Sequence, residues 1–515
     1  MLHKLKKYFI IVGVLSLLMF VNTQLIPRIN TVRESAGLTR NLPLDNAPPQ
    51  YVLAVNLLGG LRCILVDMLW LRTMKLREEE KYFEMAQLYN WICQLEPQIE
   101  EVWAHNAWNM AYNISFEMPY PADRWRWIKK AIYLLRDEGL KYNSRSAKIR
   151  REIAWLYSHK IGQHWDEYHW FYKKQLALEM DKLIHNPDDV PAMASLGDIE
   201  SLIAVQPSLK PIWDIVEKRG IKTRDEFKSL IKTGGLSQFN QDDLDKIGLV
   251  LCSQELKEVY KLDVNLMAEL MDKFGPLDWR LPDPHAMYWA YTGRQFAEDE
   301  YEILYDRLVY ISLQSMYRRG RLFLVEQDND ILYITGPDKR FIQPMNALYE
   351  ELLDSYAGQS SEKHILSSYY YFLSEAVLLL YSSNEREQSE RFFAILQDKF
   401  PEKTGGQNYM AFVLAKLKST AKSGHYDYVK SVVFNLIRQA YWNLALNNDD
   451  EYTGLIQTAQ ELVDEYTHIV GNQRRLRLPS VDLIRQQVVT DALNGGFPKA
   501  LQMSLKEKLD SQPER

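Results

Sequence analysis

The segment DWRLPDPH crowds two carboxylates, a guanidinium group and an imidazole into eight residues. A carboxylate next to a histidine can tune that histidine for proton transfer, so Asp278, Arg280, Asp283 and His285 form a candidate catalytic site. The same side chains also have a structural explanation, which we expect to hold. Asp283 would cap a helix with a proline in its first turn, Asp278 would pair with Arg280, and Trp279 would anchor the loop in the core.

The segment HKIGQHWDEYH offers the best set of potential metal ligands: His159, His164, His169, Asp166 and Glu167. Imidazole and carboxylate groups are ordinary ligands of zinc. On a helix, however, each step of five residues rotates a side chain by about 140°, so the three histidines would share no face. The span also crosses a predicted turn, so we expect surface or packing histidines here and no metal site.

Common catalytic and nucleotide-binding motifs are missing from the sequence. It contains neither GxGxxG nor GxxxxGK(S/T), and neither HExxH nor GxSxG. The cysteines, Cys63, Cys93 and Cys252, lie far apart and show no spacing typical of zinc ligands or of a disulfide framework. We therefore expect no bound cofactor and no catalysis.

Two basic clusters, MYRRGRL at 316–322 and NQRRLRLP at 472–479, could each meet a phosphate group or an acidic partner. The whole chain is acidic, with a formal net charge of −6 and a pI of about 6.0. Neither cluster has interleaved aromatic residues, so we expect solvated helix ends and no nucleic-acid surface.

The elements that must position these side chains are helices, and residues 80–157 repeat a helix-hairpin pattern with a period of about 34 residues. One amphipathic helix ends at Pro97, and the next begins near Glu100 with Trp103 on its inner face. Such a hairpin cannot bury its apolar face alone and stacks on its neighbours. The pattern predicts a mainly α fold, a right-handed α-solenoid of helical hairpins.

Residues 81–157 resemble tetratricopeptide repeats (TPR), and the resemblance depends on Met85, Tyr89, Leu95, Pro97, Trp103 and Ala107. The match is degenerate, because the usual small residue of the second helix is Met85. A weaker match lies at 392–401. The resemblance implies peptide or protein binding in a concave groove, and no residue is carried over as catalytic.

A broader similarity links the runs LGGLRCILVDMLWLR, KYFEMAQL, VWAHNAWNMAYN and GPLDWRLPDPHAMYWA to a family of uncharacterised bacterial membrane-anchored repeat proteins. This resemblance implies no activity.

Tryptophan is concentrated in the repeat region, where eight of the 13 tryptophans lie between residues 91 and 170. Large aromatic side chains fill gaps between stacked helices and also anchor partners at interfaces. The candidate partner-binding residues are Trp91, Trp103, Trp108, Trp125 and Trp127.

The N-terminus carries three lysines before an uncharged run at 8–26 that is stopped by Pro27. We interpret residues 1–26 as an uncleaved signal anchor, a single transmembrane helix, because no Ala-x-Ala cleavage pattern follows. The body of the protein would then lie on the exported, periplasmic-type side of the membrane. A cleaved signal is the open alternative.

A second apolar segment, Tyr51–Leu71, contains Arg62 and Asp67. Charges at the centre of a bilayer are costly, so we expect a buried helix, although a second membrane contact stays open.

The predicted organisation has a non-repeat centre and one small β-hairpin between helical halves. The boundaries are 27–50 for a linker, 51–187 for TPR-like hairpins, 188–275 for an irregular helical insertion, 276–356 for a helical segment with a hairpin near 321–335, 357–503 for C-terminal TPR-like helices, and 504–515 for a flexible tail.

The sequence therefore favours a membrane-tethered scaffold or adaptor that binds a protein or peptide partner in its helical groove. An enzyme with a site at Asp278, Arg280, Asp283 and His285 is the first alternative, and a soluble structural protein with a cleaved signal is the second. The sequence leaves the oligomeric state open.

Overall fold

The computed structural model describes residues 61–511 except 328, 329, 384, 424 and 472, together with residues 13, 23, 25, 27–29 and 31–32. The predicted signal anchor at 1–26 and the linker at 27–50 therefore lie almost wholly outside the described residues. The chain divides into two units, Met1–Leu65 and Val66–Arg515, and the fold described below is that of the second. Among the helices in the described part of the chain, none is both long and apolar enough to cross a membrane.

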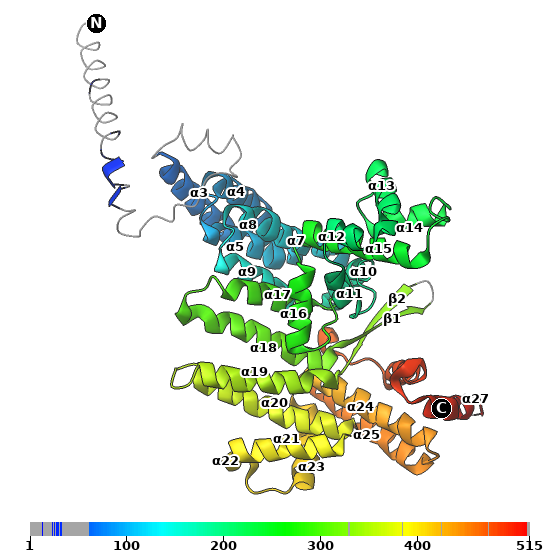
Figure 1. The fold of residues 1–515 in the computed structure, drawn as a ribbon. Coiled ribbons are helices and arrows are strands. Elements are labelled where there is room, and N and C mark those ends of the chain that lie inside the picture. The colour runs from blue at the N-terminus through cyan, green and yellow to red at the C-terminus, as the bar shows by residue number, and fades with distance from the viewer. Residues whose placement is uncertain are drawn as a thin grey trace. The chain divides into compact units, whose positions relative to one another are not determined.

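The first third of this unit is a series of helices joined by short turns (Figure 1). Several of them continue through π-helical segments, labelled η. The elements are α3 (Leu61–Glu78), α4 (Tyr82–Leu95), α5 (Glu100–Trp108), η1 (Asn109–Ile114), α6 (Ser115–Glu117), α7 (Pro121–Tyr133), η2 (Leu134–Gly139), α8 (Leu140–Tyr142), α9 (Ala147–Trp155), η3 (Leu156–Ile161) and α10 (His169–Asp181).

Local signals in the sequence account for these boundaries. Pro121 occupies the first turn of α7, where its missing N–H costs nothing. Ser146 caps α9 by accepting a hydrogen bond from the backbone N–H of Ile149. The carbonyl of Pro97, between α4 and α5, accepts hydrogen bonds from Trp103 Nε1 at 2.8 Å and from Asn143 Nδ2 at 2.7 Å. One turn thus receives a side chain from α5 and another from the residue that follows α8.

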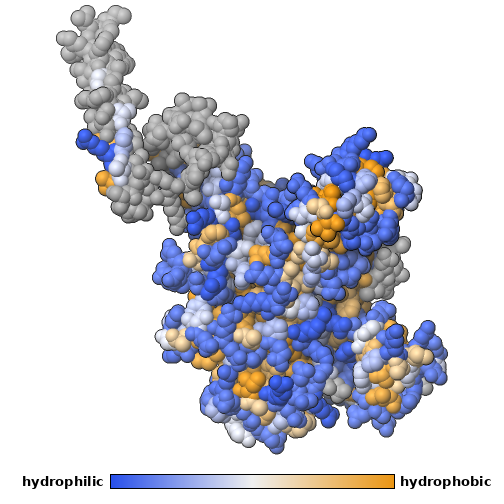
Figure 2. All heavy atoms as spheres, viewed as in Figure 1, coloured by the Kyte–Doolittle hydropathy of each residue, from blue (hydrophilic) through white to orange (hydrophobic). Residues whose placement is uncertain are grey.

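The region that the sequence marks as an irregular insertion forms short helices with an apolar cluster of their own. Thr223 and Glu226 form a reciprocal capping box at the start of α14. The helices are α11 (Asp189–Leu196), α12 (Ile199–Val205), α13 (Lys210–Arg219), α14 (Arg224–Lys232), α15 (Gln241–Glu255) with η5 (Leu256–Tyr260), and α16 (Val264–Phe274). On the mainly hydrophilic face of Figure 2, an apolar area lies over α12 and α13.

The predicted hairpin near 321–335 is confirmed as the antiparallel pair β1 (Arg321–Gln327) and β2 (Asp330–Gly336). The register runs from Arg321 opposite Gly336 to Gln327 opposite Asp330. The hairpin follows α17 (Pro282–Arg294) and α18 (Glu302–Arg319), and β2 packs against α10, α18 and α24.

The C-terminal part is again helical, and successive helices from α17 to α21 lie side by side in rows (Figure 1). Residues 504–511, expected to belong to a flexible tail, are helical, and Leu505 is fully buried. The elements are α19 (Ile342–Ser355), α20 (Glu362–Ser382), α21 (Arg386–Lys399), α22 (Pro401–Thr404), α23 (Tyr409–Thr420), α24 (Tyr426–Ala445), α25 (Asp449–Val470), the 3₁₀ turn η9 (Arg474–Leu476), α26 (Val481–Asp491) with η10 (Ala492–Gly496), and α27 (Lys499–Ser511).

The described chain is thus mainly helical with one small two-stranded sheet, which confirms the mainly α class and the hairpin of the prediction. The larger of two apolar clusters in the described residues runs from Val66 in α3 to Leu505 in α27, and the smaller one lies in the insertion.

Candidate functional site

The predicted catalytic segment lies buried at the start of α17. Its helix begins at Pro282, and Asp283 does not cap it, because its carboxylate is turned into the interior. Asp278 does pair with Arg280 at 2.9 Å, and Arg280 also reaches Asp181 at 2.8 Å. The loop is therefore pinned largely as the structural explanation predicted, with a different role for Asp283.

His285 is fully buried, and its Nε2–H donates to the carbonyl of Trp279 at 2.8 Å. Its ring stacks on Tyr157, with 4.8 Å between the ring centroids. Burial lowers the pKa of His285 to about 4, so the imidazole is neutral near pH 7. A substrate has no access to Asp283 or His285 in this conformation, since each is only 1% exposed.

Asp283 belongs to a buried ionic cluster centred on Arg319, the last residue of α18. Arg319 contacts Asp283 at 2.9 Å and Asp427 at 3.0 Å, and it also donates to the carbonyl of Gly162. Asp427 in turn accepts a hydrogen bond from His164 Nε2 at 3.0 Å. Burial opposes ionisation of Asp427, but the charge of Arg319 and the contact with His164 hold its pKa well below the usual range. The cluster joins α17, α18, α24 and the turn after η3.

His164 and His169, which helical spacing would place on different faces, lie next to each other beside this cluster. Residues 162–168 form turns, not a helix, and they bring His164 Nδ1 within 3.4 Å of His169 Nδ1. Lys173 Nζ lies 3.3 and 3.2 Å from these two nitrogens. The predicted turn therefore brings His164 and His169 together as packing histidines, although helical spacing alone would separate them. The described residues hold no group of three or more His, Cys, Asp or Glu side chains that could bind a metal.

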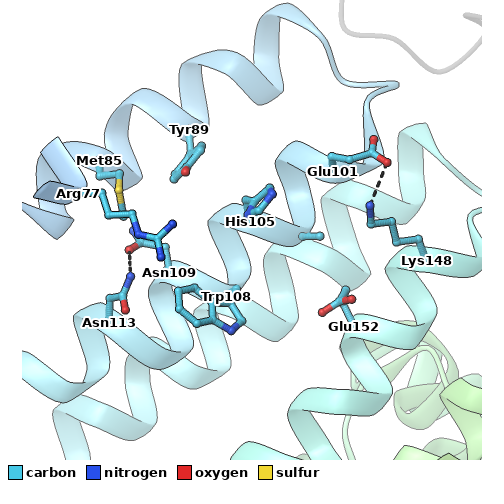
Figure 3. Close-up of a pocket in the computed structure, with 11 residues that line it drawn as sticks. Arg77, Met85, Tyr89, Glu101, His105, Trp108, Asn109, Asn113, Lys148 and Glu152 are labelled. Carbon is cyan, nitrogen blue, oxygen red and sulfur yellow. Dashed lines mark hydrogen bonds and ion pairs between the residues drawn. The ribbon is translucent and has the colours of Figure 1, made fainter. Parts of the chain in front are cut away.

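An open cavity of about 370 Å³ lies between α3, α4, α5, η1 and α9 (Figure 3). Glu101 on α5 pairs with Lys148 on α9 at 2.9 Å across one side of it. Trp108, 39% exposed, lies along its wall. The cavity is lined by Arg77, Met85, Tyr89, Glu101, Ala104, His105, Trp108, Asn109, Asn113, Lys148 and Glu152.

A second cavity, of about 240 Å³, is lined by Tyr112, Phe116, His159, Lys160, Trp165 and Asp166. A series of aromatic contacts connects it to the first. Trp108 stacks on Tyr112 at 5.6 Å between centroids, and the Tyr112 hydroxyl lies 2.9 Å from His159 Nδ1. His159 stacks on Trp165 at 5.9 Å and on Trp155 at 4.6 Å. We call the two cavities and this series the aromatic groove.

The π-helical segments present these side chains to the groove. Tyr112 and Asn113 lie on η1, and His159 and Lys160 lie on η3. A π-helical turn changes which residues share a face, and such turns recur at functional sites.

A buried ion pair forms the floor of the second cavity. Lys160 Nζ lies 2.8 Å from Asp166, and Arg124 lies 3.4 Å from the same carboxylate. The ammonium group of Lys160 is also 4.6 Å from the centroid of the Phe116 ring and 5.2 Å from that of Tyr112. Burial opposes ionisation of Asp166, but Lys160 and a backbone hydrogen bond from Tyr168 lower its pKa. The floor is therefore charged and fixed, and it lies beneath aromatic walls.

The five predicted partner-binding tryptophans occupy different environments. Trp103 and Trp125 are buried, and Trp125 stacks on Tyr172 at 6.1 Å. Trp127 is half-buried and packs edge-on against Phe83. Trp91 is exposed on α4, and only Trp108 of the five lines either cavity of the aromatic groove.

Tyr112, His159 and Trp165 were not predicted as groove residues. Trp165 belongs to the tryptophan-rich stretch, which was a usable signal. The face on which Tyr112 and His159 lie depends on the π-helical turns, for which the sequence offers no pattern.

No family model, no curated protein and no solved structure matches this chain. The functional interpretation therefore depends on the geometry of the aromatic groove.

Proposed function

We propose that this protein is a membrane-tethered, TPR-like helical scaffold that binds a protein or peptide partner in the aromatic groove. The observation that carries the proposal is the continuous series Trp108–Tyr112–His159–Trp165, which joins two open cavities. Aromatic anchors in preformed pockets supply most of the binding energy at many interfaces. No catalytic step is proposed, because the imidazole and carboxylates of the alternative site are buried and do not face a cavity of this groove.

The packing of the helices supports the repeat part of the proposal. Helix α5 packs against α4, α7 and α9, as expected for stacked hairpins. In this arrangement α5 with η1 and α9 with η3 line the groove, and α7 packs behind them. We propose that the hairpins continue as a right-handed α-solenoid.

Crosslinking in native membranes followed by mass spectrometry tests the proposal. The wild-type chain should form specific crosslinks to a partner through α5, η1 and α9, and Trp108→Ala should reduce their yield at least about tenfold. The matched control is Trp170→Ala, which removes another exposed tryptophan (51% exposed, against 39% for Trp108) that lines neither cavity. Equal losses in both variants, or no specific crosslinks at all, would contradict the proposal.

The proposed membrane anchor at residues 1–26 is tested separately. Residues 1–26 should remain in the mature protein and resist extraction from membranes at alkaline pH. A mature N-terminus beyond residue 26 would instead identify a cleaved signal.

A further inference from the structure

The basic cluster at 472–479 lies beside the second cavity of the aromatic groove. Arg475, on the 3₁₀ turn η9, donates from Nη1 to the carbonyl of Trp165 at 3.1 Å. Its guanidinium carbon is 5.7 Å from the centroid of the Trp165 ring. On its other side, His169 Nε2 donates to the carbonyl of Arg475 at 3.3 Å. The turn is thus held against residues that are about 300 positions away in the sequence.

This turn carries arginines without partner acids. The sequence from 473 to 480, QRRLRLPS, contains three arginines and no carboxylate. Arg474 and Arg477 are exposed, and among the described residues no acid pairs with them, whereas Arg485 on the next helix pairs with Asp482. The Cα atoms of both lie within about 8 Å of the Cα of Arg475, because consecutive Cα atoms are about 3.8 Å apart. We call Arg474, Arg475 and Arg477 the arginine turn.

The adjacent cavity has the size and lining of a pocket for one large side chain. Its walls are the rings of Tyr112, Phe116, His159 and Trp165, and Trp165 and Phe116 are 62% and 50% exposed. Such rings pack well on an aromatic or large aliphatic group. Arg124, Lys160 and Arg475 contact residues of this pocket, and together with Arg474 and Arg477 they outnumber the neighbouring carboxylates of Asp166 and Glu167. The pocket therefore lies in a local positive field on a chain whose net charge is −6.

We infer that this surface binds an acidic protein segment that carries an aromatic residue. The aromatic side chain fills the cavity formed by Tyr112, Phe116, His159 and Trp165, and flanking carboxylates pair with the arginine turn, where the planar guanidinium groups donate bidentate hydrogen bonds. This inference rests on the proposed function and names the chemistry of its partner. A nucleic acid is the weaker candidate, because a polynucleotide needs a longer basic track than three arginines.

Fluorescence anisotropy on the full, detergent-solubilised chain tests the inference with three labelled synthetic peptides, GEEWEEG, GEEAEEG and GKKWKKG, and with a labelled ten-nucleotide oligothymidine. We expect GEEWEEG to bind at least about tenfold more tightly than each of the other three probes. Its affinity should fall as salt rises, because ion pairs at an exposed surface are screened.

Two variants locate the binding. R474E/R477E should weaken GEEWEEG binding at least about tenfold, and Trp165→Ala should remove the difference between GEEWEEG and GEEAEEG. The control K218E/R219E makes the same change in charge at exposed positions on α13 and should leave binding unchanged. Far-ultraviolet circular dichroism verifies that each variant is folded.

Other results would overturn the inference. Tighter binding of oligothymidine would assign the surface to nucleic acid, and a dimerisation that Trp165→Ala abolishes would assign it to a second copy of this chain. If the three peptides bind with equal affinity, or if R474E/R477E does not weaken the binding of GEEWEEG, the arginine turn does not have this role. If GEEWEEG does not bind but the crosslinks that depend on Trp108 persist, this inference fails and the proposed function stands; if those crosslinks are also lost, both fail.

Discussion

Arg319 at the end of α18 holds Asp283 in the first turn of α17 across 2.9 Å, and both side chains are at most 4% exposed. The same guanidinium group contacts Asp427 on α24, 108 residues further along the chain. One arginine therefore forms ion pairs with two carboxylates from distant segments, the fully buried Asp283 and the 15% exposed Asp427.

Replacing Arg319 by Met should destabilise the protein by about 3–5 kcal/mol, because the buried carboxylate of Asp283 would lose its ion-pair partner. Urea unfolding followed by circular dichroism measures the change. The control is Lys273→Ala, which removes an exposed pair with Glu351 and should cost less than about 1 kcal/mol. Adding Asp283→Asn to the Met variant should recover part of the loss, and no recovery would contradict this account of the cluster.

Stability should fall as the pH drops from about 6.5 to about 4. His285 and His164 each have a pKa lowered to about 4 by burial, against an ordinary value of 6.5. The unfolded chain therefore binds protons in this window while the folded chain does not, and the stability present above pH 6.5 is lost on acidification. The lowered pKa of the buried His285 corresponds to roughly 3 kcal/mol.

His285→Gln tests this assignment, since it retains a donor for the carbonyl of Trp279 and removes the titration. Urea unfolding at pH 7.5, 6, 5 and 4.5 should show a shallower pH slope in this variant than in the wild type. An unchanged slope would show that His285 does not contribute to it.

The tryptophans of the repeat region should separate into two classes on substitution. Trp103→Ala should cost about 3–5 kcal/mol, because its buried ring leaves a cavity between α5 and its neighbours. Trp108→Ala should leave the unfolding midpoint almost unchanged and reduce partner crosslinking. Differential scanning calorimetry measures the first effect, and a Trp108 variant as unstable as the Trp103 variant would place Trp108 in the core instead of the groove.

Replacing each of two helical glycines by alanine should change the stability of the protein in opposite directions. A Cβ at Gly293 in α17 would lie 2.8 Å from the ring of Tyr305 and 3.1 Å from Cβ of Arg150, so Gly293→Ala should destabilise by about 1–3 kcal/mol. A Cβ at Gly248 in α15 would meet no atom within 4 Å, so Gly248→Ala should stabilise by about 0.5–1 kcal/mol. Thermal unfolding measures the stability change in both variants. A stability change of the same sign in both would contradict the close packing at Gly293.

Local sequence patterns predicted those helices and strands whose formation depends on residues within one short segment. The spacing of apolar residues predicted the helices on both sides of Pro97, and the β-rich runs around Gln327 predicted the hairpin. The short helices of the insertion were also expected, because glycines and capping residues mark their ends.

The candidate site is formed by contacts between segments that are far apart in the chain. Asp283 was expected to cap its own helix, but Arg319 gives it a charged partner in the interior, and pairing a buried charge outweighs a local capping bond. His164 and His169 meet because the chain turns between them. The arginine turn reaches Trp165 across 310 residues.

The sequence by itself determined a mainly helical chain, its hairpin and the region rich in aromatic residues, since these follow from propensity and periodicity within short windows. Only the tertiary structure decided which tryptophans are buried, which rings line the aromatic groove and which charges lie beside it. Those outcomes depend on π-helical turns and on long-range packing, whose energies no local pattern in the sequence encodes.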